Sequence, residues 1–350
     1  MERFVVVAPN WLGDAVMALP AIADVRNGRP RASLVVAARA SVAPLFSLVR
    51  EVDDVVVLPR RGPYPLGGSD IALLLPNSFH SALMTARAGV RERWGYRNDW
   101  RALLLTRAVR RPPASTHQID SYRHLVHALG FANGPAYPRL DPKPDCRAIG
   151  AELLQRAGWN GQTPLVAIAP GAAYGSAKRW PPSAFADLAA GLAKDGVIVV
   201  MVGAEADRRT ASEVLHALAG RSPALDFVGR TDLSTLAGVL LNCRALVAND
   251  SGASHLAAAL GISVSVPFGA TDERTNAPRP RVRSTEQRVV RSEPRDASSE
   301  QRIASRESQA AVFTHPVWCR PCWLRECPLD HMCMRGIAAA DVLAATRRML

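Results

Sequence analysis

Side chains that could carry out a reaction gather first around Asp14, in the short loop that follows the first apolar run of the chain. A carboxylate at this point, where a helical pattern begins, could act as a general base or could simply cap the helix. The neighbours Asn10, Trp11 and Gly13 favour a functional loop, because tryptophan offers an aromatic face to a sugar ring and glycine permits a tight turn. We therefore expect Asp14 to face a substrate.

The loop from 169 to 181 separates an apolar run from another helical pattern and is suited to a diphosphate. Its small residues permit close approach of the backbone to a ligand, and two cations arrive just before the helix begins. The residue order of a Walker loop is absent, so an ordinary strand-to-helix loop with surface cations is the alternative. The residues expected to bind are Gly171, Ala173, Tyr174, Lys178 and Arg179.

The run from Asn249 to His255 also follows an apolar strand and opens a helix. Free backbone N–H groups at a helix start attract an anion, so this run is expected beside the same ligand. For His255, a packed structural histidine is the alternative. Glu205 follows a further apolar strand, as do the acids that hold a ribose hydroxyl in dinucleotide folds, and a helix N-terminal acid is the alternative. The remaining candidates of the run are Asp250, Ser251 and Gly252.

Four of the six cysteines lie close together near the end of the sequence, at the spacing C-x2-C-x4-C-x5-C. Thiolates at such short spacing could hold zinc or an iron–sulfur cluster. Buried thiols without a metal are the alternative, because tryptophan and methionine residues surround them. The residues concerned are Cys319, Cys322, Cys327 and Cys333.

These candidates need a scaffold, and the pattern of apolar runs predicts one. Short β-branched runs alternate with helical patterns throughout both halves of the chain, which indicates parallel sheets covered on both faces. Ligands of such sheets bind at the carboxyl ends of the strands. The expected fold class is α/β, with two doubly wound Rossmann-like domains that face each other across a cleft.

The domain organisation follows from shifts in composition. A proline-rich run at 141–144 indicates a boundary, and we assign 1–150 to the first domain and 151–278 to the second. Residues 279–312 are rich in arginine, serine and acids and are expected to form a mobile insert. Residues 313–350 form a Cys-rich tail and a C-terminal helix.

The charge is uneven. Of a net +12, the first 150 residues carry +8, from 20 basic against 12 acidic residues. That excess predicts an anionic partner, although an arginine-rich solvated face is the alternative. No nucleic-acid-binding motif is present, which argues against nucleic acid. The longest apolar runs are too short to span a membrane and the start does not read as a signal peptide, so a cytoplasmic protein is expected.

Several separated motifs, in order, resemble glycosyltransferase family 9, the ADP-heptose:lipopolysaccharide heptosyltransferases. They are the run from Pro9 to Pro20, the loop that ends in Ala177–Pro181, the segment Asn249–Leu256 and the segment Phe268–Asp272. The cysteine-rich tail is similar to the type II members in particular. The resemblance covers nearly the whole chain outside 279–312.

The resemblance implies a GT-B fold with an acceptor-binding first domain, a donor-binding second domain and a final helix that packs back on the first domain. It implies inverting, metal-independent transfer of L-glycero-D-manno-heptose from ADP-heptose to the heptosyl-Kdo2-lipid A inner core. Asp14 would be the general base, and Lys178 would neutralise charge on the leaving ADP. Asp250, Ser251, Gly252 and His255 would bind or orient the nucleotide-sugar, and Glu205 would approach the ribose.

The partners implied are ADP-heptose, the anionic lipopolysaccharide acceptor and the cytoplasmic face of the inner membrane, contacted peripherally. No cofactor is implied beyond the donor itself. Two alternatives stay open. One is another GT-B sugar-nucleotide enzyme, such as heptosyltransferase I or an epimerase, and the other is a non-catalytic, arginine-rich anion-binding module.

Overall fold

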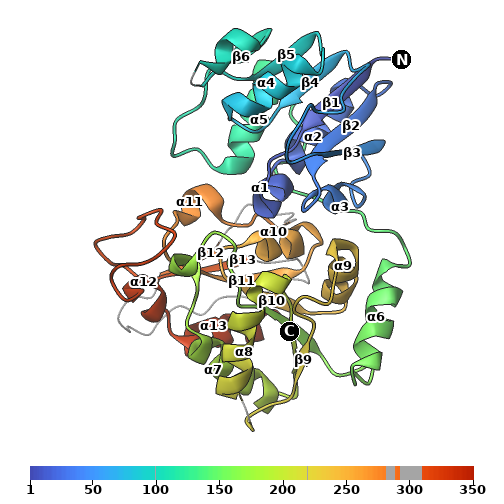
Figure 1. Cartoon of the computed structure of the whole chain (residues 1–350). Coiled ribbons are helices and arrows are strands. Elements are labelled where there is room, and N and C mark those ends of the chain that lie inside the picture. Colours follow the sequence, from blue (N-terminus) through green and yellow to red (C-terminus); the bar gives the residue numbers. More distant parts are fainter. Residues whose placement is uncertain (99, 219, 281–287, 292–309) are drawn as a thin grey trace. The chain divides into compact units, whose positions relative to one another are not determined.

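Figure 1 shows the computed structural model of the chain, which divides into two compact units, residues 1–143 and 144–350. The structure describes all residues except 99, 219, 281–287 and 292–309. The junction falls inside the proline-rich run at 141–144, seven residues before the boundary assigned from the sequence. Proline restricts the backbone on both sides of such a junction, which suits a connection that belongs to neither core.

The first unit is built on a parallel six-stranded sheet with the order β3-β2-β1-β4-β5-β6. The central strands are buried except at the end residues of β1 and β2, and their buried side chains are almost all apolar, as a sheet covered on both faces requires. The strands are β1 (Arg3–Val7), β2 (Ser33–Arg39), β3 (Asp54–Leu58), β4 (Ile71–Leu74), β5 (Glu92–Tyr96) and β6 (Arg107–Val109).

The residues from Ala15 to Arg26 have one continuous helical pattern in the sequence, but the structure forms two helices there. Pro20 lies in the first turn of the second helix, where its lack of an amide hydrogen prevents continuation of the first one. The helical segments of this unit are α1 (Leu12–Met17), α2 (Leu19–Gly28), α3 (Ala43–Phe46), α4 (Phe79–Arg87), α5 (Gln118–Ala128) and the 3₁₀ helix η1 (Arg101–Leu104).

The second unit has a parallel seven-stranded sheet with the order β12-β13-β11-β10-β7-β8-β9. Strand β10 lies between β7 and β11, so the loops that follow these three strands emerge side by side. The strands are β7 (Leu165–Ala169), β8 (Ile198–Met201), β9 (Ala224–Asp226), β10 (Ala245–Ala248), β11 (Ser263–Phe268), β12 (Arg288–Arg291) and β13 (Ala310–Thr314). The apolar pair Phe227 and Val228 reads as a short strand in the sequence, but strand β9 ends one residue earlier, at Asp226.

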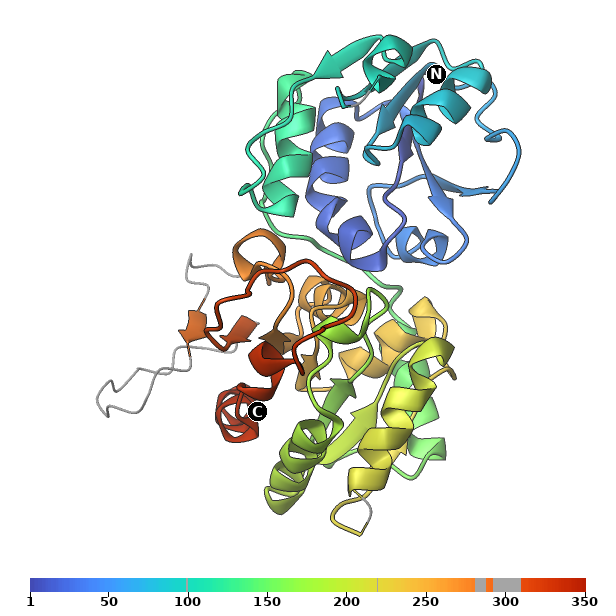
Figure 2. The ribbon, with the colours of Figure 1, turned by 60° about the vertical axis from the view of Figure 1, so that its left-hand side comes forward.

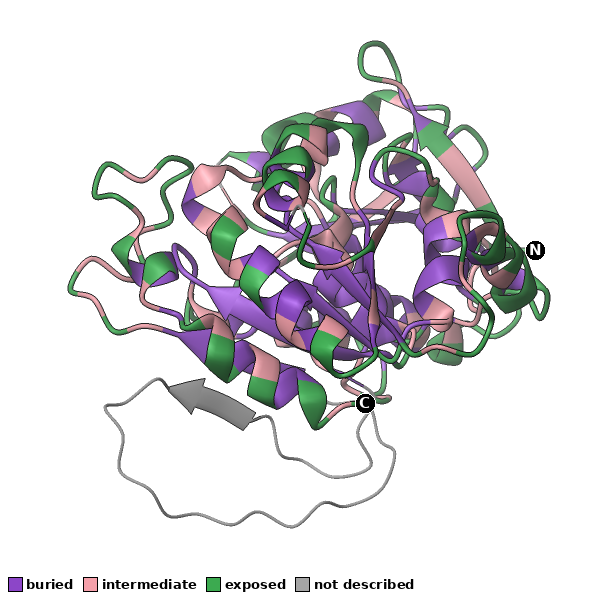
Figure 3. Cartoon of the chain, turned by 90° about the horizontal axis from the view of Figure 1, so that it is seen from below, coloured by how far each residue is buried: buried purple, intermediate pink, exposed green. Residues whose placement is uncertain are grey.

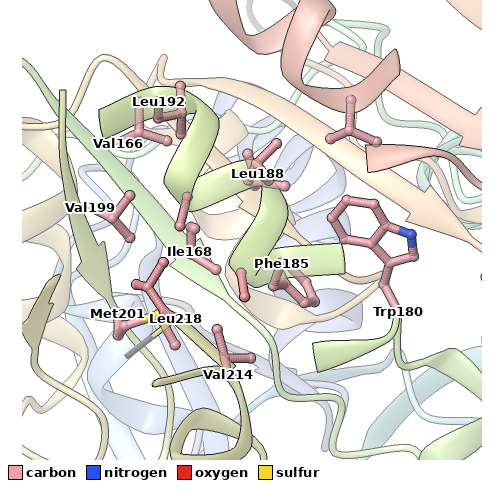
Figure 4. Packing of buried hydrophobic residues seen from close by; sticks show 14 of the residues in the cluster. Val166, Ile168, Trp180, Phe185, Leu188, Leu192, Val199, Met201, Val214 and Leu218 are labelled. Carbon is pink, nitrogen blue, oxygen red and sulfur yellow. The ribbon is translucent and has the colours of Figure 1, made fainter. Parts of the chain in front are cut away.

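Helices cover this sheet. Its central strands β7, β10 and β11 are buried, and Figure 3 shows buried strands inside the molecule and exposed residues on the outer faces of the helices. The core beneath α7 contains Trp180 and Phe185, whose rings meet edge to face with centroids 4.9 Å apart (Figure 4). The helical segments are α6 (Cys146–Arg156), η2 (Ser176–Lys178), α7 (Pro182–Lys194), η3 (Glu205–Asp207), α8 (Arg208–Leu218), α9 (Leu233–Leu241), α10 (Gly252–Ala259), α11 (Glu273–Asn276), α12 (Met332–Arg335) and α13 (Ala339–Arg347).

The final part of the chain differs from expectation at two points. Residues 310–312, assigned to the insert, begin β13, which pairs with β11 in the sheet. The rest of the predicted insert, apart from 279–280 and β12, lies outside the described residues. The last helix, α13, packs in the second unit against α7 and β11, whereas the family resemblance placed it on the first domain. Thr346 fixes it there, because its hydroxyl lies 3.0 Å from that of Ser265 in β11.

Candidate active site

Asp14 stands in the first turn of α1, directly after the loop that follows β1. Its side chain is half-buried, and the neighbouring Tyr122 of α5 is buried. Burial, and after it the negative charge of Asp14, raise the pKa of Tyr122 well above its ordinary value. Tyr122 therefore stays protonated at neutral pH. The first unit thus presents a carboxylate beside a neutral hydroxyl at the carboxyl edge of its sheet.

The neighbours of Asp14 only partly match their predicted roles. Asn10 is exposed and Trp11 is 46% exposed, so both side chains are open to a substrate. Gly13, by contrast, lies inside α1 and does not have the positive φ angle of a tight turn. The turn interpretation of Gly13 is therefore wrong, because the chain enters the helix at Leu12 without needing one.

In the second unit, the loops after β7, β10 and β11 meet at Asp250. One carboxylate oxygen, Oδ2, accepts hydrogen bonds from Lys178 Nζ and from Thr271 Oγ1, each at 2.6 Å. The side chains of Lys178 and Asp250 are only 13% and 5% exposed, so the ion pair is largely shielded from water. The pair fixes the position of the ammonium group at the edge of the sheet where a nucleotide is expected.

His255 lies behind this pair in α10, with Nε2 3.9 Å from Asp250 Oδ1. Burial is the main cause that lowers its pKa to about 4, and the positive charge of Lys178 adds to it, whereas Asp250 acts in the opposite direction. The imidazole is consequently neutral at physiological pH.

Two buried donors at this edge lack a hydrogen-bond partner among the described residues, namely Nε of Arg179 and Oγ of Ser251. An unsatisfied buried polar group costs about 1–3 kcal/mol, so native proteins rarely keep one without a reason. Both residues belong to the loops from which the sequence predicted a ligand site. Gly252, the first residue of α10, follows Ser251 directly.

Asn249 and Thr271 belong to the motifs quoted from the sequence, but neither was assigned an individual role. Asn249 is fully buried, and its side chain accepts from Trp180 N at 2.9 Å and donates to Pro170 O at 2.7 Å. It therefore ties the loop after β10 to both ends of the loop after β7. The signal for such a residue is a polar side chain at the end of a buried strand, where it must find partners.

Gly171, in the loop after β7, lies directly against a side chain of the protein itself. A Cβ atom on Gly171 would come within 2.1 Å of the carboxylate of Asp207, so glycine is needed there to accommodate a neighbouring side chain. Ala173 is exposed. Tyr174 has its ring 4.9 Å from Lys178 Nζ, a cation–π contact, and its hydroxyl donates to the carbonyl of Trp323 at 2.5 Å.

Glu205 begins η3, after β8, apart from the Asp250 cluster. Its side chain is 72% exposed and forms an ion pair with Arg208, at 3.0 Å between Oε1 and Nε. This pairing lowers the pKa of Glu205. A Cβ atom on Gly229 would lie 2.0 Å from Glu205 Oε2, so the carboxylate packs directly against the backbone of Gly229, where a side chain would clash.

The cysteine-rich tail docks on the loops after β7 and β11 of the second unit, as Figure 2 shows for the red segment beside them. The amide of Ala177 donates to Arg325 O at 3.0 Å, and that of Trp323 donates to Ala270 O at 2.8 Å. Arg320 bridges to Gly269 O at 2.9 Å and to the carboxylate of Glu273 at 2.6 Å. The tail thereby braces the loops after β7 and β11.

The four tail cysteines have free thiols. Cys327 Sγ accepts two backbone N–H groups, from Leu329 and His331, at 3.4 and 3.3 Å. Burial, and then the neighbouring Cys319 and Cys327, raise the pKa of Cys333, which favours the neutral thiol. Within the part of the chain that the structure describes, no three Cys, His, Asp or Glu side chains are arranged to hold a metal ion. The metal hypothesis for Cys319, Cys322, Cys327 and Cys333 thus gains no support from this arrangement.

Comparisons with known proteins agree with this architecture. Residues 65–331 match the family model described as glycosyltransferase family 9 (heptosyltransferase). The lipopolysaccharide heptosyltransferase 2 of Salmonella typhimurium is 32% identical over 279 residues, which cover 74% of this chain and 80% of that protein. The Escherichia coli K12 protein of the same name is 30% identical over 287 residues, covering 76% and 82%.

A solved structure, E. coli ADP-heptose lipopolysaccharide heptosyltransferase II, aligns with 100% of this chain and 98% of its own, with a TM-score of 0.77 and 24% identity. Two Rossmann-like units with this topology define the GT-B fold, and the family match makes the chain a glycosyltransferase. More particularly, the chain belongs to glycosyltransferase family 9.

Proposed function

We propose that the protein transfers L-glycero-D-manno-heptose from ADP-heptose to the heptosyl-Kdo2-lipid A inner core, as a type II heptosyltransferase. The similarity of at least 30% to two proteins named lipopolysaccharide heptosyltransferase 2, over about three quarters of the chain, carries this proposal. The site geometry supports the chemistry. The two units supply the two functions that a transfer requires, a base on the first and a fixed cation on the second.

In the proposed reaction, Asp14 accepts the proton of an acceptor hydroxyl as that oxygen attacks the anomeric carbon of the heptose. The bond between the anomeric carbon and the β-phosphate oxygen breaks in the same displacement, and ADP leaves with the electron pair. Attack opposite to the leaving group inverts the anomeric configuration. Lys178 stabilises the negative charge that develops on ADP.

The Asp250 carboxylate has a positioning role in this scheme. It holds the ammonium of Lys178 through a 2.6 Å hydrogen bond, so the cation is oriented before the donor arrives. Preorganised charge of this kind stabilises a transition state without reorganisation at the moment of reaction. Arg179, Ser251, Gly252 and Glu205 would complete the nucleotide-sugar site.

Because the acceptor is a lipid, we propose that the enzyme acts at the cytoplasmic face of the inner membrane and binds it peripherally. No helix among the described residues is long and apolar enough to span a bilayer. The excess positive charge of the first 150 residues supports contact with phosphates and Kdo carboxylates of the acceptor.

The test is to incubate purified protein with ADP-L-glycero-D-manno-heptose and heptosyl-Kdo2-lipid A, and to follow ADP release and product mass. A product heavier by one heptose supports the proposal. Kdo2-lipid A serves as the second acceptor, and preference for it would assign the protein to heptose I transfer instead. No transfer to either acceptor from folded protein would overturn the proposal.

Asp14→Asn should lower the transfer rate by about 10²- to 10⁴-fold, the usual contribution of a general base. Asp54→Asn is the matched control, because Asp54 is an exposed acid of the same unit whose Oδ1 accepts from the amide of its neighbour Val55. Equal rates for the two variants would remove Asp14 from the mechanism.

A further inference from the structure

The segment that links β5 to β6 presents two large apolar side chains to solvent. Trp100 and Leu103 are each 83% exposed. They are three residues apart at η1, and in a 3₁₀ helix residues at i and i+3 lie one above the other. The two side chains therefore form one outward-facing apolar ridge. Ridges of this kind on soluble domains usually mark an interaction surface.

The opposite face of η1 is anchored inside the unit. Arg101 is fully buried between the two exposed residues in sequence, and its Nη1 donates to the carbonyl of Pro76 at 2.5 Å. Leu104 and Leu105 pack against the hydrophobic core that contains β1, β2 and β4. Because the inner face is fixed, the ridge cannot fold back onto the protein without breaking these contacts.

Arginines flank the ridge in the sequence and follow the paired ends of β5 and β6. Arg97, Arg110 and Arg111 are exposed, and no carboxylate among the described residues forms an ion pair with them. The amide of Arg97 donates to Val109 O at 2.7 Å, which brings the ends of β5 and β6 together. The segment 97–113 contains five arginines and one acid, Asp99, which lies outside the described residues.

This surface lies at the same edge of the first unit as Asp14. Arg97 and Arg110 directly follow the carboxyl ends of β5 and β6, and Asp14 follows the carboxyl end of β1 by a short loop. Tyr122 links the two places electrostatically, because both Asp14 and Arg111 shift its pKa. A molecule held at the ridge by a lipid tail would therefore present its polar head on the side of the catalytic carboxylate.

We propose that the docking ridge, formed by Trp100, Leu103, Arg97, Arg110 and Arg111, binds the surface of an anionic lipid bilayer. Trp100 and Leu103 enter the interfacial region, where tryptophan is favoured, and the three arginines contact lipid phosphates. The combination of an apolar ridge with unpaired cations is complementary to a negatively charged membrane surface. The purpose of this contact rests on the proposed function, since the acceptor is a lipid.

Vesicle co-sedimentation of the full chain tests the proposal, with phosphatidylcholine vesicles that do or do not contain phosphatidylglycerol. Trp100→Ala with Leu103→Ala should lower the partition onto anionic vesicles by about tenfold or more, as expected for losing two interfacial apolar side chains. Arg110→Gln with Arg111→Gln should lower it by about fivefold per arginine on anionic vesicles, and this loss should shrink at high salt.

Trp318→Ala is the matched control, because Trp318 is also 83% exposed but belongs to the tail of the second unit. It should bind vesicles like the wild type. Equal binding of the wild type and the Trp100/Leu103 double variant would overturn the proposal, as would an equal loss in Trp318→Ala. Wild-type protein that ignores both vesicles but self-associates would assign the ridge to a protein contact instead.

Activity separates this inference from the proposed function. The Trp100/Leu103 double variant should keep wild-type transfer to a deacylated, water-soluble acceptor and lose transfer to the same acceptor embedded in vesicles. If wild-type protein transfers heptose to neither acceptor, the proposed function fails, while vesicle binding still decides the role of the ridge. Unchanged transfer by the double variant to the embedded acceptor would refute the docking role.

Discussion

The Lys178–Asp250 pair allows a quantitative test of how the loops after β7 and β10 are held together. In Asp250→Asn the ammonium of Lys178 loses its countercharge but remains largely shielded from solvent, because the side chain of Lys178 is only 13% exposed. Removing one partner of a buried ion pair typically destabilises a protein by about 3–5 kcal/mol. That is a large part of the roughly 5–15 kcal/mol that stabilises a domain. The variant should therefore open more often around β10 and α10.

Removing both charges should cost much less than the two single changes together. In the double variant Asp250→Asn, Lys178→Met no buried charge is left without a partner, so we expect a favourable coupling of about 3 kcal/mol. Hydrogen exchange read by mass spectrometry on peptides from η2, β10 and α10 measures the opening free energy locally, which avoids assuming that both units unfold together. Single effects that add within about 0.5 kcal/mol would refute the pairing, because independent sites behave in this way.

Three further outcomes are expected. Because the pKa of His255 in the fold is about 4, against an ordinary 6.5, the unfolded state binds its proton first as pH falls. The free energy of unfolding of the second unit should therefore fall by up to about 3 kcal/mol as the pH is lowered from 6.5 to about 4. Thermal unfolding of His255→Gln should depend less on pH over this range than that of the wild type. The same pH dependence in both proteins would contradict the burial argument. Gly171→Ala should destabilise the protein by about 1–3 kcal/mol, because the added methyl group would clash with Asp207. Gly67→Ala is the control, because no atom lies within 4 Å of the position of its Cβ. Thermal unfolding measures both variants, and equal destabilisation would contradict the clash. Arg320→Gln should raise the KM for ADP-heptose several-fold and leave that for the acceptor unchanged, and steady-state kinetics with an unchanged donor KM would exclude the bracing role.

The local sequence pattern predicts those helices and strands whose conformation follows from their own residues and end caps. The helix Leu233–Leu241 and the strand Ala245–Ala248 have the predicted bounds, because one is an apolar helical run behind an Asp232 cap and the other is a buried strand. The break between α1 and α2 was not predicted, although Pro20 is a residue type that starts helices and interrupts them. Strand β13 was missed because its Ala-Ala-Val start follows a long polar stretch and its partner, β11, lies more than forty residues earlier.

The site shows the same division. Asp14, Lys178 and Asp250 could be named from their motifs, and their positions after β1, β7 and β10 follow from the strand pattern. The partners of these residues could not be named, because Thr271 and Asp250 are 21 residues apart and only sheet order brings them together. The bracing of the donor loops by Arg320 depends on contacts across about fifty residues, which no local signal contains.

The tail contacts have a consequence for the order in which the protein matures during synthesis. Residues 1–143 form a unit of contiguous sequence, so it can fold while the ribosome is still translating the rest. The loops after β7 and β11 cannot be braced at that stage, because Ala177 and Gly269 find their partners in Arg325 and Arg320. A nascent chain would therefore carry a finished first unit long before these loops reach their final arrangement, and premature termination before Arg320 would yield fragments that lack the bracing contacts.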